Sequence, residues 1–471
     1  MLLECPSVRL SVILILLAAV PLAQADVIVL KNGKRIVVDT AREQNGRVQY
    51  EVGDNSFAIS MSLVDRIETG VGAPTGRSEM APPQFTPNET ISVSPDLSNK
   101  LIHDGKVDIE ALAALDRSPD QETAASGYFR AAKFEQEHGN PDKAVRYYGL
   151  ALGHMPNSNI ILDHYASSLI QMGRGEEAVS LAERSTRIAP NSGDGWMVLG
   201  FAYYAADRDE DAIEAWKKSE EIRPDATVKK YLAKARRDAQ TQANFQQRDS
   251  GHFTLRYEGH SVPDALSNSI LQTLEVHYDA LAEQFNVTPR TIPVILYTEQ
   301  EFVDVTQSPS WTGAVNDGKI RIPISGITLM TPELSRILRH ELSHTFINQV
   351  SHGKCPQWLH EGIAQVLEGR TTAPFGKTLS KLYADDHEVP MYMLEGSFMN
   401  LGRDEAAVAY VQSLAVTEFI RDTYGMDDLR SILQKIGQGT STEAAIRTTL
   451  HSGYSQLEQD VARYLANRYG T

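Results

Sequence analysis

Two histidines and a glutamate near residue 340 have the types and spacing of a metal-dependent hydrolytic site. The stretch RILRHELSHTF, residues 336–346, contains His340 and His344 four positions apart, with Glu341 directly after the first histidine. On a helix this spacing projects both imidazoles from one face, where both can bind one Zn²⁺. Glu341 then lies where it can act as general base on a water held by the metal. The alternative is a helix whose histidines are ordinary, partly buried polar side chains.

A hydrolytic zinc site needs a third protein ligand and an open position. A histidine six residues after His344 would supply the ligand, but that position is Val350. Glu361 follows His344 by 17 residues, enough for the chain to leave one helix, turn and return in a second. The adjacent His360 is an alternative ligand, although neighbouring helix residues point about 100° apart. We predict Glu361 as the ligand, with Gly362 beside it allowing close approach to the first helix.

Two consecutive helices must position these residues. Thr331 followed by Pro332 is a typical helix start, with the hydroxyl as cap and proline at the first helical position. On the second helix, in PQWLHEGIAQVLEG, Gln365 and Glu368 share the face of Glu361. Both are candidates to orient a ligand imidazole through its second nitrogen.

The region before these helices reads as strands with one long helix. HFTLRY alternates as a strand, LSNSILQTLEVHYDALAEQF is an amphipathic helix, and PVILY and KIRIPI are further strands. Strands that precede a run of helices indicate an α+β domain. The stretch at 313–324, GAVNDGKIRIPI, is either an edge strand that pairs with a peptide backbone or an internal strand of the sheet.

The order of these motifs resembles a known enzyme family. HExxH followed by W-L-x-E-G-x-A, here WLHEGIA, is similar to the gluzincin metallopeptidases, and more narrowly to the peptidase MA-like domain. The similarity continues through LEGSF at 394–398 and AAVAYVQSLAVTEFI at 406–420. The resemblance implies a zincin-like α+β metallopeptidase domain over residues 250–471 with a helical C-terminal subdomain.

The resemblance also implies a role for each site residue. It implies Zn²⁺ bound by His340, His344 and Glu361, with Glu341 as base in the hydrolysis of a peptide or protein substrate. It implies Tyr410 as the donor that stabilises the oxyanion, although a tyrosine on an apolar helix face is also a common core residue. GAVND lacks the glutamate of the clan's aminopeptidases, which favours an endopeptidase.

Residues 125–226 repeat with a period of 34 residues. Three prolines and three alanines recur in phase: Pro156, Pro190 and Pro224, and Ala144, Ala178 and Ala212. The period and pattern resemble the tetratricopeptide repeat (TPR). We therefore predict an all-α solenoid over residues 120–243, with three repeats and a capping helix, that binds a protein partner. The alternative function for the whole chain is a TPR scaffold whose peptidase domain is inactive or latent.

The N-terminal residues divide into three segments by composition. Residues 1–25 place an apolar run after Arg9 and end in AQA, which is typical of a cleaved secretory signal, with an uncleaved anchor as the alternative. Residues 26–70 alternate in polarity and predict a small β-rich module. Residues 71–119 are rich in proline, glycine and serine and read as a linker.

Charge and cysteine content limit the partners and the compartment. The net charge of −16 argues against nucleic acid and against an anionic membrane surface. No later segment is apolar for long enough to span a membrane, so we expect no insertion beyond the signal segment. Removal of the signal leaves one cysteine, Cys355, which is either a plain apolar residue or a cap on zinc in a latent form. A chain without a disulfide behind a signal sequence favours the bacterial periplasm.

Overall fold

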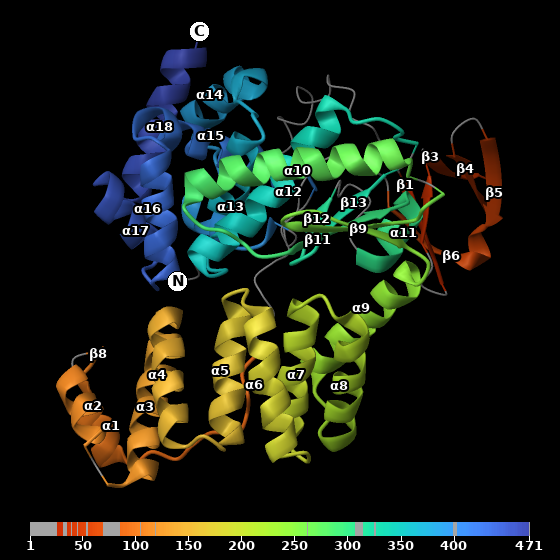
Figure 1. Cartoon of the computed structure of the whole chain (residues 1–471). Coiled ribbons are helices and arrows are strands. Elements are labelled where there is room, and N and C mark those ends of the chain that lie inside the picture. The colour runs from red at the N-terminus through yellow and green to blue at the C-terminus, as the bar shows by residue number, and fades with distance from the viewer. Residues whose placement is uncertain are drawn as a thin grey trace, which may run out of the picture. The chain divides into compact units, whose positions relative to one another are not determined.

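The computed structural model describes most of the chain from residue 26 onward (Figure 1). The described residues are 26–68, 85–306, 314–398 and 403–470, apart from gaps at 32–34, 39, 45, 53–54, 104, 118, 261 and 325. The predicted signal peptide at residues 1–25 lies outside them. Among the described residues, no helix combines the length and the apolar character needed to cross a membrane.

Two three-stranded antiparallel sheets follow the predicted signal segment. The first has the order β2 (Arg35–Val38), β1 (Asp26–Leu30), β6 (Val64–Glu68). The second has the order β3 (Thr40–Gln44), β4 (Arg47–Val52), β5 (Asn55–Ser60). Ile28, Ala41, Val48 and Val64 form a small buried core, in keeping with the alternating sequence.

The described part of the predicted linker is structured, which corrects the prediction from composition. Residues 71–84 of that segment lie outside the described part, but α1 (Pro95–Leu101) and α2 (Ile109–Leu115) follow, joined by the hairpin β7 (Ile102–His103) and β8 (Lys106–Val107). Ser94 and Asp108 accept backbone N–H groups of α1 and α2 as helix caps. Ser94 and Pro95, which belong to the composition that suggested a linker, are therefore helix-start residues, and Asp108 has the same role in α2.

Three helix pairs form the repeat region at the positions that the 34-residue period predicts. They are α3 (Gln121–Glu137) with α4 (Pro141–His154), α5 (Asn159–Gln171) with α6 (Gly175–Ile188), and α7 (Gly193–Ala205) with α8 (Asp209–Ile222). The capping helix α9 (Ala226–Gln242) packs against α8. A Cβ at Gly200 would lie 2.3 Å from the Trp216 ring, so the small residue allows the third pair to pack closely.

A five-stranded mixed sheet precedes the two helices that carry the predicted site. Its order is β12 (Val315–Asn316), β13 (Ile320–Pro323), β11 (Ile292–Tyr297), β10 (Phe253–Tyr257), β9 (Gln246–Asp249). β10 pairs in parallel with β11, and β11 with β13, through the crossover helices α10 (Asp264–Phe285) and α11 (Glu299–Thr306). Residues 313–324 divide between the two alternatives, because β12 lies at the edge of the sheet and β13 is internal. Pairing of the edge strand with a peptide backbone stays a prediction.

Helices make up the remainder of the described chain. They are α12 (Pro332–Ser351), α13 (Gln357–Leu367), α14 (Gly376–Ala384), α15 (Arg403–Thr423), α16 (Met426–Gly437), α17 (Thr442–Leu450) and α18 (Tyr454–Tyr469). α12 packs against α10, α13 and α16, and α13 packs against α15. These contacts fix the two helices that carry the predicted site.

A buried charge network joins the capping helix to the sheet. Arg321 on β13 and Asp238 on α9 are fully buried and form two hydrogen bonds, Nη1 to Oδ1 at 2.6 Å and Nη2 to Oδ2 at 2.8 Å. Arg321 Nε also donates to Asp317 Oδ1 at 2.9 Å. Close by, buried Lys319 donates to both carboxylate oxygens of Asp209 on α8 at 2.7 Å. The repeat region and the C-terminal region accordingly belong to one compact unit.

Candidate metal centre

Helix α12 begins where the sequence predicts. The Thr331 side chain accepts the Leu334 N–H at 3.0 Å, and proline occupies the first turn. Leu338, Leu342 and Phe346 are fully buried and hold α12 in the core. Packing of this apolar stripe fixes the rotation of the helix, and with it the direction of the histidines.

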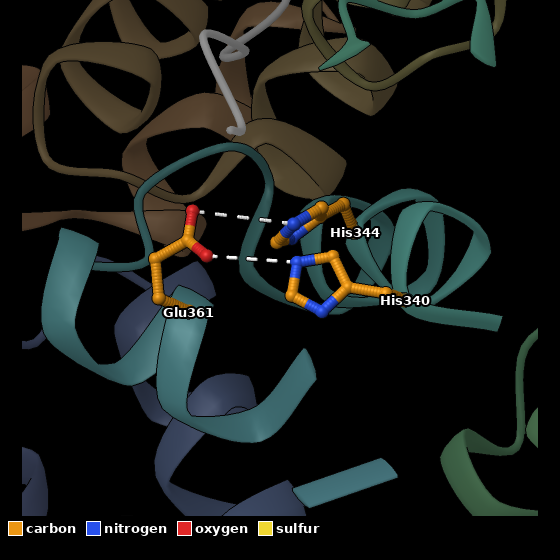
Figure 2. A group of neighbouring side chains, drawn as sticks. All are labelled: His340, His344 and Glu361. Atoms are coloured by element: carbon orange, nitrogen blue, oxygen red, sulfur yellow. Dashed lines mark ion pairs between the residues drawn. The ribbon is translucent and has the colours of Figure 1, made fainter. Parts of the chain in front are cut away.

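The three predicted ligands meet at one point (Figure 2). His340 Nε2 lies 3.7 Å from Glu361 Oε2, and His344 Nε2 lies 4.0 Å from Glu361 Oε1. One nitrogen of each imidazole and one carboxylate oxygen all lie within 4.8 Å of one another. α12 supplies both imidazoles, and α13 supplies the carboxylate that faces them.

Several polar atoms of this group are buried without a hydrogen bond. Among the described residues, His340 Nε2, both ring nitrogens of His344 and both carboxylate oxygens of Glu341 have no hydrogen-bond partner. A buried polar group left in this way costs about 1–3 kcal/mol. Two imidazoles facing a carboxylate match the donor set of Zn²⁺. The arrangement therefore fits a divalent cation, which would occupy these nitrogens and balance the acidic charge.

The charges around the group shift its pKa values strongly. Burial lowers the pKa of His340, but the carboxylates of Glu368 and Glu361 outweigh it and raise that pKa to about 10. Burial lowers the pKa of His344 well below its ordinary value, and His360 adds to the shift. Burial raises the pKa of Glu341 to about 8, against the opposing effect of His340. A cation at this point favours neutral imidazoles and ionised carboxylates.

His360, the alternative ligand, has a different partner. Its Nε2 donates to Asn348 Oδ1 at 3.1 Å, and its ring stacks on His344 with the centroids 4.5 Å apart. Burial lowers the pKa of His360 to about 3, with His340 adding to the effect. Nε2 is thus engaged by Asn348, and His360 does not belong to the group of ligand atoms that converge, which favours Glu361 as the third ligand.

Glu368 lies where the sequence predicts a residue that orients an imidazole. Its Oε1 is 3.4 Å from His340 Nδ1 and 2.9 Å from Arg370 Nε. A carboxylate on the second nitrogen fixes the ring and makes it a more basic ligand. Gln365 has another role than expected, because its Nε2 donates to the backbone carbonyls of Glu361 at 3.3 Å and Tyr410 at 3.0 Å. It thus ties α13 to α15.

Gly362 allows a close helix contact, but with a different helix from the one we expected. A Cβ at this position would lie 2.1 Å from Thr417 Oγ1 and 2.5 Å from the Ser413 carbonyl, both on α15. The small residue therefore brings α13 against α15 and not against α12. The packing nevertheless fixes the position of Glu361, the adjacent residue.

Asn316 is a site residue that the sequence reasoning missed. Its Nδ2, at the edge strand β12, donates to the Glu341 carbonyl and to Thr345 Oγ1, both at 2.7 Å. This amide therefore connects the sheet to the middle of α12. The local signal in the sequence is weak, because it consists of an asparagine that follows two apolar residues, Ala314 and Val315.

Tyr410 is buried on α15, with 2% of its surface exposed. Its ring contacts Phe398 with centroids 5.2 Å apart, and its carbonyl accepts from Gln365. The hydrogen bond from Gln365 connects it to α13, the helix of Glu361. Its catalytic role stays a prediction.

The fold and the candidate site combine three features: a helix carrying HExxH, a second helix whose glutamate faces both histidines, and a mixed sheet. Comparison with family models agrees. Residues 280–467 match the model described as the Peptidase MA superfamily, so the chain contains a domain of that superfamily.

The repeat region is similar to TPR proteins. The chain is 33% identical over 91 residues to small glutamine-rich tetratricopeptide repeat-containing protein 2 of Mycosarcoma maydis. The aligned region covers 19% of this chain and 26% of that protein. The chain thus spans about a quarter of the length of this curated relative.

Solved TPR structures match a similar share of the chain. The Sgt2 TPR domain from Aspergillus fumigatus is 24% identical and has a TM-score of 0.25, with 26% of this chain and 81% of that chain covered. The first TPR of Spaghetti (RPAP3), bound to an HSP90 peptide, is 16% identical and has a TM-score of 0.24, with 25% and 93% covered.

Proposed function

We propose that the protein is an exported zinc-dependent peptidase whose TPR helices recruit a protein partner or substrate. The observation that carries the proposal is the convergence of His340, His344 and Glu361 within a Peptidase MA superfamily domain. The buried Glu341 beside them supplies the base that hydrolysis requires.

Each residue of the site has a distinct task in this proposal. His340, His344 and Glu361 hold Zn²⁺, which supplies Lewis-acid activation of water and of the scissile carbonyl. Glu341 accepts a proton from the attacking water at a carboxylate oxygen and passes it to the leaving amine. Tyr410 donates a hydrogen bond from its hydroxyl to the developing oxyanion. Tyr410→Phe should then lower kcat while zinc binding is unchanged.

The sequence and the sheet support proposals for the substrate and for the compartment. We propose an endopeptidase because GAVND lacks the acid that holds a substrate amine. β12 is an edge strand and contacts α12, the helix that carries His340 and His344. Peptide binding by strand addition requires such an edge strand. We propose export to the periplasm because residues 1–25 have the composition of a cleaved signal.

Metal analysis of two variants tests the proposal. The wild type should contain one zinc per chain and cleave an unstructured protein such as casein. His344→Ala should lose the zinc, because it removes one of the ligands. Glu341→Gln should keep the zinc and lose activity by about 10²–10⁴-fold, the usual contribution of a general base. Bound zinc in a wild type that cleaves none of a broad peptide library would instead support the inactive scaffold.

A further inference from the structure

An extended segment of the chain, residues 85–91, lies against the inner helices of the repeats. Its side chains alternate between buried and exposed, and it belongs to no helix or strand. Phe85 is 7% exposed and stacks on Phe201 of α7, with ring centroids 4.1 Å apart and planes at 14°. The aromatic ring is thus held in the core of the second and third repeats.

The repeats hold the backbone of this segment through side chains on one face of α5. Gln171 Nε2 donates to the Phe85 carbonyl at 3.1 Å, and His164 Nε2 donates to the Glu89 carbonyl at 2.9 Å. Ser167, between them in the helix, also faces the Phe85 carbonyl at 3.4 Å. Residues three, four and seven apart share a helix face, so α5 presents a row of donors to an extended chain.

Helix α7 holds the other side of the segment. Fully buried Asp194 accepts the Glu89 N–H at 2.6 Å and the Asn88 side-chain amide at 3.1 Å. The Glu89 carboxylate in turn accepts from Ser192 Oγ at 3.0 Å and from Asn159 Nδ2 at 3.3 Å. The repeats therefore contact backbone groups of the segment and three of its side chains: the Phe85 ring, the Asn88 amide and the Glu89 carboxylate.

We infer that residues 85–91 are an intramolecular ligand of the groove between α5 and α7, and that the groove takes an external peptide of the same chemistry only when this segment leaves. The external ligand is an extended peptide with an aromatic residue and an acidic residue four positions further on. The backbone contacts fit any extended chain. Phe201 selects the aromatic residue, and Ser192 and Asn159 select the acidic residue.

The tethered segment competes with any external peptide. A ligand joined to its own site has an effective concentration near the millimolar range, so it lowers the apparent affinity of a free peptide. The inference takes from the proposed function only that the repeats bind a partner. Its test measures binding and not hydrolysis, so either proposal can fail while the other stands.

Binding of a labelled peptide to the full chain tests the inference. The probe is a fluorescent peptide with the sequence of residues 85–92, FTPNETIS, and its anisotropy gives the dissociation constant. In Phe85→Ala/Glu89→Gln the internal segment loses both anchors, while every groove residue remains. We expect this variant to bind the probe with a Kd at least about tenfold below that of the wild type.

Two matched controls identify the site. A probe that carries the same two substitutions should bind neither protein. Asn159→Ala, added to the double variant, should weaken binding of the probe, because it removes one hydrogen-bond donor to the glutamate of the probe. A double variant that binds no more tightly than the wild type, although its circular dichroism is native, would overturn the inference.

Hydrogen exchange of the wild type gives a readout that does not depend on a variant. The Glu89 amide is bonded to Asp194, so it should exchange slowly in the free protein. Saturating unlabelled peptide should displace the segment and speed exchange across residues 85–91. Unchanged exchange at saturating peptide would show that the segment is a fixed part of the fold and not a displaceable ligand.

Discussion

At the scale of single residues, charge placed beside the ligands decides how the candidate site behaves. The Glu368 carboxylate lies within ion-pair distance of both His340 Nδ1 and Arg370. Because Nδ1 faces this carboxylate, the imidazole of His340 would present Nε2, the nitrogen nearer to Glu361, to a metal. In the proposed zinc site the carboxylate would therefore act on the metal through the ring and not by direct contact.

Glu368→Gln should weaken zinc binding by about 10–100-fold, the usual cost of removing a partner of a ligand histidine. The amide keeps the shape of the side chain but loses its charge. Competition with a chelator of known affinity measures the change. Glu333→Gln, an exposed change on the same helix as His340, is the matched control and should leave zinc affinity as it is. Equal affinities for both variants would contradict this role of Glu368.

A second buried carboxylate, Asp163 in the repeats, makes stability depend on pH. Burial raises its pKa to about 7, and Asp194 and Glu89 add to the shift against the opposing effect of Ser185. A carboxyl whose pKa is raised on folding binds its proton more tightly in the folded state. Its stabilising effect is therefore complete below the unfolded pKa and disappears as the pH rises towards 7.

Asp163→Asn should accordingly stabilise the protein at high pH and change little at low pH. We expect a gain on the order of 1–2 kcal/mol in the free energy of unfolding of the repeats at pH 8, and almost none near pH 4. Unfolding in urea, followed by circular dichroism at both values, measures the difference between variant and wild type. The same difference at pH 4 and pH 8 would rule out this titration.

At the scale of elements, the site depends on how closely α13 packs against α15. Gly362 lies next to Glu361 and has Thr417 and the Ser413 carbonyl where a Cβ would be. Any side chain at this position pushes α13 away from α15. Since Glu361 is on the same turn, its carboxylate moves with the backbone.

Gly362→Ala should therefore destabilise the protein by about 1–3 kcal/mol, as overpacking of a core does, and should weaken zinc binding. Thermal unfolding and chelator competition measure the two effects. Gly153→Ala in α4 is the control, because no atom lies within 4 Å of its added Cβ. Replacing a helical glycine in open space should stabilise by about 0.5–1 kcal/mol. A Gly362 variant as stable as the Gly153 variant would contradict the packing argument.

Elements whose signals are local could be predicted from the sequence, and those that depend on distant contacts could not. The cap at Thr331, the spacing of His340 and His344, and the 34-residue period are all patterns within one or two helices. Asn316 contacts the Glu341 carbonyl 25 positions away, and no local pattern indicates that partner. Residues 85–91 read as a linker because a peptide held by hydrogen bonds needs no hydrophobic period.

At the scale of the whole molecule, the repeats are joined to the sheet by buried charges. Arg321 and Asp238 are 83 positions apart, yet neither is exposed. Arg321 lies on β13, which pairs with β12. Asn316 of β12 donates to the Glu341 carbonyl of α12. A short chain of contacts therefore runs from the capping helix to the backbone of Glu341.

Asp238→Ala should cost about 3–5 kcal/mol of stability, because it leaves the Arg321 charge buried without its main partner. Differential scanning calorimetry measures the loss. Arg447→Ala breaks an ion pair whose partners are both well exposed and should cost about 0–1 kcal/mol. Similar melting temperatures for the two variants would show that the junction contributes little.

The Arg321 network has a practical consequence for dissecting the protein. A fragment that stops after α9 would leave the Asp238 carboxylate facing water without its guanidinium. A fragment that starts at β9 would leave Arg321 with Asp317 as its remaining carboxylate partner, and would remove both carboxylates that pair with Lys319, those of Asp207 and Asp209. We expect both truncations to express poorly and to aggregate, whereas a piece from Phe85 to Gly470 keeps every participant of the network. Recombinant work on either half should therefore begin from that longer piece.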